Sequence, residues 1–160
     1  MIMPFEIERR FLVYGDIWRS CSNGTRIIQG YFSTGTDQKV RIRIRDKSAY
    51  LTIKGKRQGI VRSEFEKTIS VPLAQTLLSR LPPEKLIEKT RYEIPHGELV
   101  WEIDVFEGRN AGLVLAEVEL SHPEQPVVLP AWVGKEVTFD DRYTNSHLSE
   151  EPVSTWFQAA

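Results

Sequence analysis

The chain has 160 residues, of which 41 % are hydrophobic and 27 % charged, so it has the composition of a soluble globular protein that buries its own core. The formal net charge of −1 provides no global field that would attract nucleic acid or an anionic membrane, so any anion site must arise from local sorting of charge. A single cysteine, Cys21, excludes a disulfide framework and a zinc site built on thiolates.

The remaining global signals favour a cytoplasmic protein. No apolar run approaches the roughly 18 residues that a membrane span needs, and we expect no signal peptide, because no basic stretch followed by an apolar core opens the chain. We therefore expect one domain over residues 1–160, with no nucleic-acid and no membrane partner, while a homodimer stays open.

Alternation of apolar and polar residues predicts strands through the first part of the chain, joined by short turns. The predicted strands cover residues 6–14, 25–33, 39–45, 49–54 and 60–71. The basic run at 54–57 could be a mobile basic rim at the mouth of a barrel, but we expect residues 55–59 to form a solvated loop.

At Pro72 the hydrophobic period changes from two to that of a helix, which we expect to end at Pro82-Pro83. Three further strands are predicted over residues 86–94, 99–106 and 113–120. Beyond them the pattern predicts short helices or turns over one end of the fold, at residues 132–137, 140–148 and 153–159. Eight hairpin-linked strands with one inserted helix predict an α+β fold built on an eight-stranded antiparallel sheet or barrel.

The charged residues are sorted by strand. Six predicted strands each carry two like charges two residues apart, hence on one face. These pairs are Glu6 with Glu8, Arg41 with Arg43, Glu64 with Glu66, Lys89 with Arg91, Glu102 with Asp104, and Glu117 with Glu119.

Two interpretations of these faces remain open at this stage, because alternation does not show which face is inside. Polar strand faces usually point into water. If the charged faces instead surround a shared space, the basic strands would hold a polyanion and the acidic strands a divalent cation. Carboxylate oxygens without histidine or cysteine select Mg²⁺ or Mn²⁺, and a metal beside a cationic clamp suits phosphoryl chemistry.

The residues that carry these charges resemble the CYTH superfamily of triphosphate tunnel metalloenzymes, in particular its short bacterial single-domain members. The stretch from Glu6 to Val13 is similar to the ExExK signature of that family. The similarity continues, in the expected order, through Val40-Arg41-Ile42-Arg43, Leu51-Thr52-Ile53-Lys54-Gly55, Glu64-Phe65-Glu66, Lys89-Thr90-Arg91-Tyr92, Trp101-Glu102-Ile103-Asp104 and Ala116-Glu117-Val118-Glu119.

This resemblance implies an eight-stranded antiparallel β-barrel that forms a charged tunnel, with a few peripheral helices. It implies Mg²⁺- or Mn²⁺-dependent hydrolysis of the terminal phosphoanhydride bond of a triphosphate, most often inorganic tripolyphosphate. The superfamily leaves adenylate cyclase and thiamine or nucleoside triphosphatase as alternatives. A polyphosphate-binding module without turnover is a further alternative from another functional class.

The resemblance also implies roles for individual residues. The metal-binding group would comprise Glu6, Glu8 and Glu119, with Asp104 and Glu117 beside it. The phosphate-binding group would comprise Arg10, Arg41, Arg43, Lys54, Lys89 and Arg91. The catalytic group would comprise Glu6, Glu8, Arg10, Tyr31, Glu66 and Lys89. In it, Glu66 would orient basic side chains or water, and Tyr31 is a candidate proton donor.

The third position of the signature departs from the family pattern. It is usually lysine, and here it is Arg10. Arginine keeps the charge but does not give up a proton usefully. An electrostatic clamp at this position would therefore be preserved, whereas a proton donor would be lost.

Overall fold

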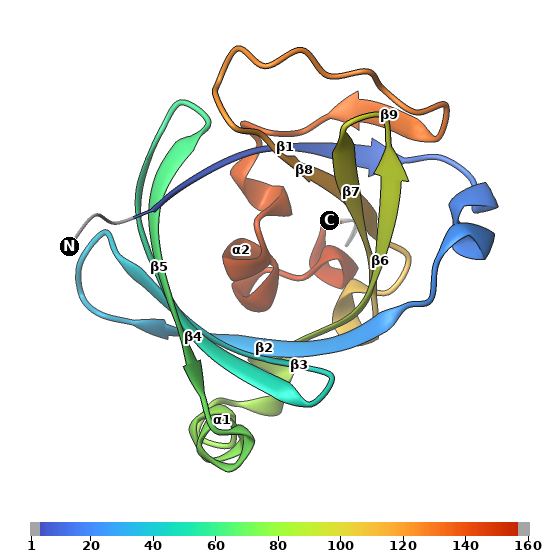
Figure 1. The fold of residues 1–160 in the computed structure, drawn as a ribbon. Helices are drawn as coiled ribbons and strands as arrows, with labels where there is room; N and C mark the ends of the chain where they lie inside the picture. The colour runs from blue at the N-terminus through green and yellow to red at the C-terminus, as the bar shows by residue number, and fades with distance from the viewer. Residues whose placement is uncertain (1–3, 157–160) are drawn as a thin grey trace.

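A computed structural model describes residues 4–156 and shows a closed antiparallel β-barrel (Figure 1). Its strands are β1 (Phe5–Val13), β2 (Thr25–Ser33), β3 (Lys39–Arg45), β4 (Ser48–Gln58), β5 (Val61–Ile69), β6 (Ile87–His96), β7 (Leu99–Phe106) and β8 (Val114–Glu119), with β9 (Val133–Glu136) added outside. The order around the barrel is β5-β4-β3-β2-β6-β7-β8-β1, and a pairing between β1 and β5 closes it. The predicted eight-stranded α+β barrel is confirmed.

Strand β1 closes the barrel by pairing on both sides. Its first residues lie opposite β5, where Glu6 faces Arg62, and Glu8 lies opposite Glu119 of β8. Directly opposed residues share a face of the sheet. Glu6, Glu8, Arg62 and Glu119 therefore all belong to one face of the barrel wall.

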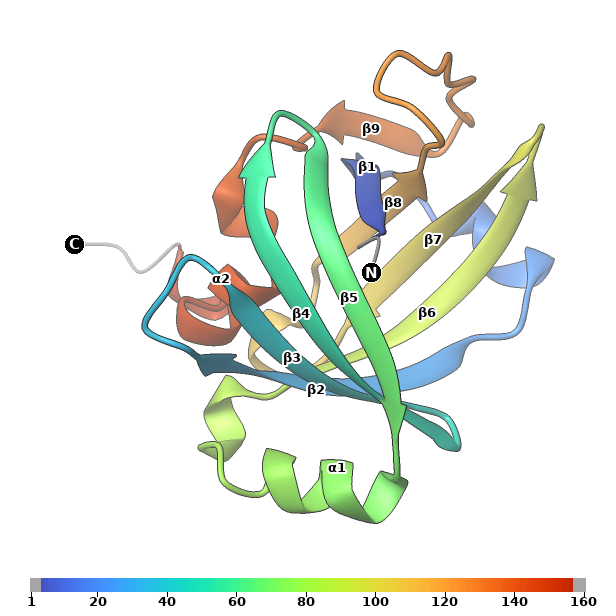
Figure 2. The same cartoon turned by 60° about the vertical axis from the view of Figure 1, so that its left-hand side comes forward.

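Helix α1 (Val71–Leu78) packs on the outside of β3 and β4 (Figure 2). The Ser70 hydroxyl accepts a hydrogen bond from the backbone N–H of Leu73, and Pro72 stands in the first turn, where no intrahelical donor is lost. Ala74 and Leu78 are buried against Ile42. The helix therefore covers the apolar outer face of these strands.

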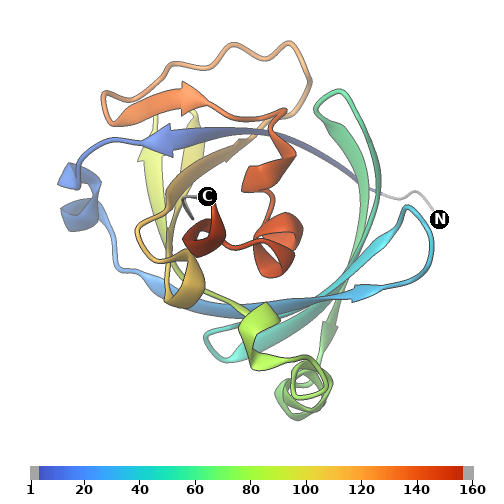
Figure 3. The same ribbon diagram turned by 180° about the vertical axis from the view of Figure 1, so that it is seen from behind.

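A C-terminal segment covers one end of the barrel (Figure 3). It contains the 3-10 turn η4 (Asp141–Tyr143), helix α2 (Asn145–Glu150) and the turn η5 (Val153–Thr155). Leu148 of α2 is fully buried in a cluster with Phe106 and Leu115, which point inward. The other 3-10 turns of the described chain are η1 (Ile17–Cys21), η2 (Pro83–Lys85) and η3 (Gly108–Asn110).

The burial of apolar residues decides which face of the sheet points inward. The fully buried Trp101, Ile103 and Val118 lie on the outer face, in a cluster covered by Trp18 and Trp132. Since successive residues alternate between faces, their charged neighbours must point into the barrel. The tunnel interpretation of the charged faces is therefore correct, and the interpretation that they form a solvated exterior is wrong.

Two local predictions need correction. The helix or turn predicted over residues 132–137 is wrong for most of that range, because residues 133–136 form β9, which pairs with the far half of β1, and Glu136 accepts a bidentate ion pair from Arg9. Residues 55–59 are not a solvated loop either, because β4 continues to Gln58 and leaves only a tight turn before β5. A 3-10 turn begins at Val153 within the short terminal helix or turn predicted over residues 153–159, and the last residues of that prediction, 157–159, lie outside the described chain. No helix within residues 4–156 combines the length and apolarity of a membrane span.

Candidate active site

The barrel interior collects charged side chains from nearly every strand, and most of them are paired with one another. The predicted site residues that lie on this inner face are Glu6, Glu8, Arg10, Arg41, Arg43, Lys54, Glu66, Lys89, Arg91, Asp104, Glu117 and Glu119. Arg10, Arg41, Lys89, Arg91 and Asp104 are less than a tenth exposed. Charges buried this deeply require partners, so the pairing within the barrel determines what remains free for a ligand.

An acidic group lies on β1 and β8. Arg10 bridges it: Nε donates to Glu117 Oε1 at 3.0 Å, and one terminal nitrogen, Nη2, donates to Glu8 Oε1 at 2.9 Å. Next to it, Lys54 Nζ donates to both oxygens of Glu6, at 2.8 and 3.0 Å. The resulting group combines three carboxylates with two cations inside a protein wall.

The carboxylates of this group differ in how readily they ionise. Burial, together with Glu117 and Glu6, raises the pKa of Glu8 to about 8. For Glu117 burial acts in the same direction, but Arg10, Arg91 and Lys89 outweigh it and hold the pKa well below its ordinary value. Glu8 is therefore the carboxylate whose negative charge is least compensated by the protein.

Asp104 anchors two cations on the neighbouring strands β6 and β7. Its carboxylate accepts from Lys89 Nζ at 2.7 Å and from Arg91 Nε and Nη2 at 2.7 and 2.9 Å, so both oxygens are occupied. Arg91 also forms an ion pair with Glu102. Burial lowers the pKa of Lys89 to about 8, although Asp104 opposes the shift.

The arginines of β3 have too few acceptors. Arg41 and Arg43 share one carboxylate, Glu66, and each lies 3.5 Å from its Oε2. Arg41 also donates to the hydroxyl of Thr52 at 3.2 Å. Burial, Arg41 and Arg91 lower the pKa of Arg43 to about 10, which reflects this crowding of positive charge.

Three buried guanidinium nitrogens make no hydrogen bond within the described residues. These atoms are Arg10 Nη1, Arg41 Nε and Arg43 Nε. Buried N–H groups almost always have an acceptor, and a charged donor without one is particularly costly. The three buried donors fit a multivalent anion, whose oxygens would accept hydrogen bonds from them.

Tyr31 lies on the same inner face, opposite Arg41 in the sheet. Its hydroxyl accepts a hydrogen bond from Gln29 Nε2 at 2.8 Å, and Gln29 also donates to Asn145 Oδ1 at 3.2 Å. The Tyr31 hydroxyl hydrogen is free to point to a ligand, since its oxygen is the acceptor in this bond.

The acidic residues do not form a preformed metal site. Within residues 4–156, no three histidine, cysteine or acidic side chains lie close enough together to hold an ion. Glu119 is the most exposed member of the predicted metal group, and burial together with Glu6 and Glu102 raises its pKa. Repulsion among Glu6, Glu8 and Glu119, with oxygen as the only donor type, fits a hard divalent cation that would draw them together.

The structure also adds residues to the interior that the sequence did not identify. Asn145 reaches in from α2 and accepts from Lys89 Nζ at 2.9 Å. Thr52 joins Arg41 to Glu66, to which its hydroxyl donates at 2.9 Å. Arg62 lines a small cavity with the acidic group and with Arg57, which belongs to the basic run at 54–57 that the sequence analysis considered. Only Arg62 had a readable signal, because it continues the two-residue spacing of Glu64 and Glu66.

Comparisons with known proteins agree with this geometry. The sequence matches the CYTH domain family over residues 4–154. It is 42 % identical over 150 residues to an inorganic triphosphatase of Acetivibrio thermocellus, covering 94 % of this chain and 96 % of that protein. It is 36 % identical over 153 residues to an inorganic triphosphatase of Nitrosomonas europaea, covering 90 % and 96 %.

The fold is similar to solved structures as well. A crystal structure of an inorganic triphosphatase superposes with a TM-score of 0.64 at 30 % identity, covering 93 % of this chain and 95 % of the other. The charged barrel, the ordered sequence motifs and these relatives agree, and the chain belongs to the CYTH domain family.

Proposed function

We propose that the protein is a Mg²⁺- or Mn²⁺-dependent triphosphatase that hydrolyses the terminal phosphoanhydride bond of inorganic tripolyphosphate inside the barrel. One observation carries the proposal: Arg10, Arg41 and Arg43 each keep a buried guanidinium nitrogen that has no acceptor among residues 4–156. Phosphate oxygens supply acceptors to guanidinium groups in the required geometry. Both curated relatives are inorganic triphosphatases, which favours this substrate over other phosphates.

The basic side chains would grip the substrate. We assign this role to Arg10, Arg41, Arg43, Lys54, Lys89 and Arg91. A triphosphate carries roughly four to five negative charges at neutral pH, and burying it without a comparable number of cations would be prohibitive. Because Asp104 holds Lys89 and Arg91 in place through both of its oxygens, we assign it chiefly to positioning these cations.

The acidic group would hold the divalent cation. We assign Glu6, Glu8 and Glu119 as its ligands, with Glu117 beside them as the partner of Arg10. The bound cation would supply Lewis-acid stabilisation of charge that develops on the phosphoryl oxygens. Lys54, which now pairs with Glu6 at 2.8 Å, would become available to the substrate when Glu6 turns to the metal.

The protein groups would act by positioning and by neutralising charge. Water would attack the terminal phosphorus in line with the leaving pyrophosphate, as in other phosphoryl transfers. Glu66 would hold Arg41 and Arg43 in position and orient the water. Tyr31, with its hydroxyl hydrogen directed to the ligand, would donate to a phosphate oxygen.

We infer a single domain that works in the cytoplasm. The one cysteine, Cys21, is exposed and unpaired, which suits a reducing compartment.

The test is phosphate release from tripolyphosphate, pyrophosphate, ATP and thiamine triphosphate, each with Mg²⁺, Mn²⁺ or EDTA. We expect tripolyphosphate to be the preferred substrate and EDTA to abolish turnover. Preference for ATP or thiamine triphosphate would support the organic-triphosphate alternatives, and formation of cyclic AMP the cyclase. Turnover of none of them would leave a binding module, and turnover that survives EDTA would refute the metal role.

A further inference from the structure

A chain of hydrogen bonds joins helix α2 to two strands inside the barrel. Lys89 Nζ donates to Asp104 Oδ2 at 2.7 Å and to Asn145 Oδ1 at 2.9 Å. Gln29 Nε2 donates to the same oxygen of Asn145 at 3.2 Å and to the Tyr31 hydroxyl at 2.8 Å. We call these five side chains the amide chain, because two amides link Lys89 to Tyr31.

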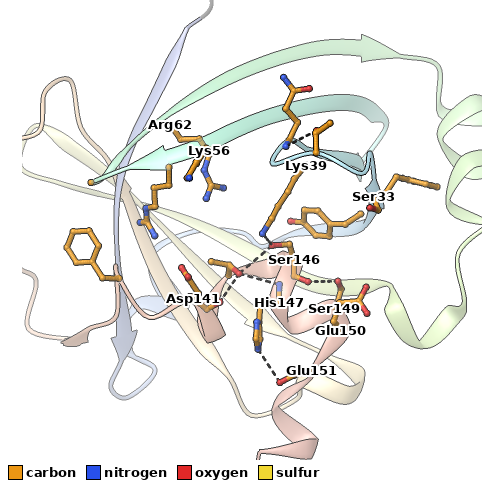
Figure 4. Close-up of a pocket in the computed structure, with 18 residues that line it drawn as sticks. Ser33, Lys39, Lys56, Arg62, Asp141, Ser146, His147, Ser149, Glu150 and Glu151 are labelled. Carbon is orange, nitrogen blue, oxygen red and sulfur yellow. Dashed lines mark hydrogen bonds and ion pairs between the residues drawn. The ribbon is translucent and has the colours of Figure 1, made fainter.

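The members of the amide chain are held firmly in place. All of them except Tyr31, which is half-buried, are less than a tenth exposed. Asn145 is the first residue of α2, and its neighbour Ser146 accepts a hydrogen bond from Lys39 Nζ of β3 at 2.7 Å (Figure 4). One turn further on, Leu148 of the same helix is fully buried. Asn145 is therefore fixed in position relative to the barrel wall.

The chemistry of each member fixes the direction of the whole chain. A lysine ammonium donates and does not accept, so the Asn145 atom that faces Lys89 must be the carbonyl oxygen. That oxygen requires a donor from Gln29, so the Gln29 amide nitrogen faces both Asn145 and Tyr31. The Tyr31 oxygen is then an acceptor, and its hydrogen points away from Gln29, into the barrel.

Gln29 alone would not favour this orientation. Its Oε1 atom is buried and accepts no hydrogen bond from any residue between 4 and 156, and a buried acceptor without a donor is costly. Turning the amide over would let this oxygen accept the Tyr31 hydrogen. The same turn would bring it against Asn145 Oδ1, so that two oxygens without a hydrogen would face each other. Asn145 therefore prevents Gln29 from capturing the Tyr31 hydrogen.

We propose that Asn145 is a positioning residue, which acts through Gln29 to keep the Tyr31 hydroxyl a hydrogen-bond donor to the bound triphosphate. The inference rests on the proposed binding of a triphosphate inside the barrel. Tyr31 lies opposite Arg41 on the inner face, where Arg41 Nε also lacks an acceptor among residues 4–156. Phosphate oxygens accept from both groups. The C-terminal segment thus contributes to substrate recognition by orienting a hydroxyl that it does not itself carry.

The test measures the factor by which Tyr31→Phe weakens tripolyphosphate binding, by calorimetry at pH 7 in EDTA, in the wild type and in three variant backgrounds. In the wild type we expect a factor of about ten, the effect of one hydrogen bond to a charged group. In Asn145→Leu, which has the bulk but no acceptor, the factor should fall below about two, because Gln29 turns over. Gln29→Glu should have the same effect, since a carboxylate only accepts. Asn145→Asp keeps the acceptor oxygen and should restore the factor of about ten, although its charge weakens anion binding overall.

Glu150→Gln is the matched control, because it removes the ion pair of α2 with Lys85, at 3.0 Å, and leaves the amide chain intact. Its factor should stay near ten, and a fall to the level of Asn145→Leu would overturn the role of the Asn145 oxygen, as would equal factors in the wild type and Asn145→Leu. If Asn145→Leu does not fold, Gln29→Glu supplies the comparison.

The same factors measured on kcat/KM with Mg²⁺ separate this inference from the proposed function. Turnover of tripolyphosphate with factors that do not depend on Asn145 refutes only the positioning role. Binding that shows the expected factors without turnover refutes only the hydrolase. Neither binding nor turnover of tripolyphosphate would refute both.

Discussion

The charge of Glu8 should destabilise the protein when no metal is bound, and Glu8→Gln tests this directly. Glu8 lies beside Glu6 and Glu117, has one hydrogen bond from Arg10, and has a pKa raised from 4.5 to about 8. Between these two values the folded protein binds more protons than the unfolded chain. The wild type should therefore lose stability as the pH rises through this window.

The magnitude follows from the shift. At about 1.4 kcal/mol per pKa unit, the upper bound is about 5 kcal/mol, and we expect a measured effect on the order of a few kcal/mol because Glu8 titrates together with its neighbours. Glutamine keeps the shape of the side chain and removes the charge. Glu8→Gln should therefore gain stability over the wild type between about pH 5 and about pH 9.

The assay is urea unfolding in EDTA at the two pH values, and the quantity is the difference in unfolding free energy between variant and wild type. Shifts common to both proteins, such as that of Lys89, cancel in this difference. Glu98→Gln, at an exposed hairpin turn, should show no pH-dependent difference. In the presence of Mg²⁺, Glu8→Gln should lose at least about a hundredfold in tripolyphosphate turnover, since a metal ligand is gone. A pH-independent difference would show that Glu8 does not lie in an acidic, buried group.

Three further substitutions test other parts of the structure. Arg10→Lys should raise KM for tripolyphosphate by about five- to tenfold. The Arg10 guanidinium bridges Glu8 and Glu117 and still has Nη1 for a phosphate oxygen, whereas a lysine ammonium cannot make all of these contacts. A higher kcat would instead show that this position needs a titratable proton donor. Gly55→Ala should lower the unfolding free energy in the same urea titration by about 1 kcal/mol, because the added Cβ would lie 2.2 Å from Ser63 Oγ. The double variant Gly55→Ala/Ser63→Ala should recover most of this loss, and no recovery would mean that the backbone itself requires glycine. Trp101→Ala should cost about 3–5 kcal/mol in urea unfolding, because the ring is fully buried against Phe11 and Trp132, and a loss below about 1 kcal/mol would contradict the outer core.

The sequence predicted the strands and the inward pairs because alternation is a local property of the chain. It could not tell which face was inside, since that depends on what covers the opposite face. In the structure, Trp18 and Trp132 cover the apolar faces of β7 and β8 from segments with no strand pattern of their own. Before the structure was known, only the ordered resemblance to the CYTH family indicated that the charged strand faces point into the barrel.

The missed residues have a common physical reason. Asn145 reaches Lys89 from a short C-terminal helix 56 positions away, and no spacing rule connects the two. The inward orientation of Arg57 depends on a one-residue bulge that reverses the alternation after Lys54. Strand β9 is four residues long, too short for a period to be read, and depends on pairing with β1.

The central claim is that the inward charged face binds a triphosphate with a divalent cation. The most direct measurement is a crystal structure of the wild-type protein soaked with Mn²⁺ and tripolyphosphate, with the metal located by its anomalous scattering. The account predicts a manganese peak between Glu6 and Glu8 inside the barrel, and phosphate density against Arg41, Arg43 and Arg91. Manganese and phosphate bound only on the outer surface of the barrel would contradict it.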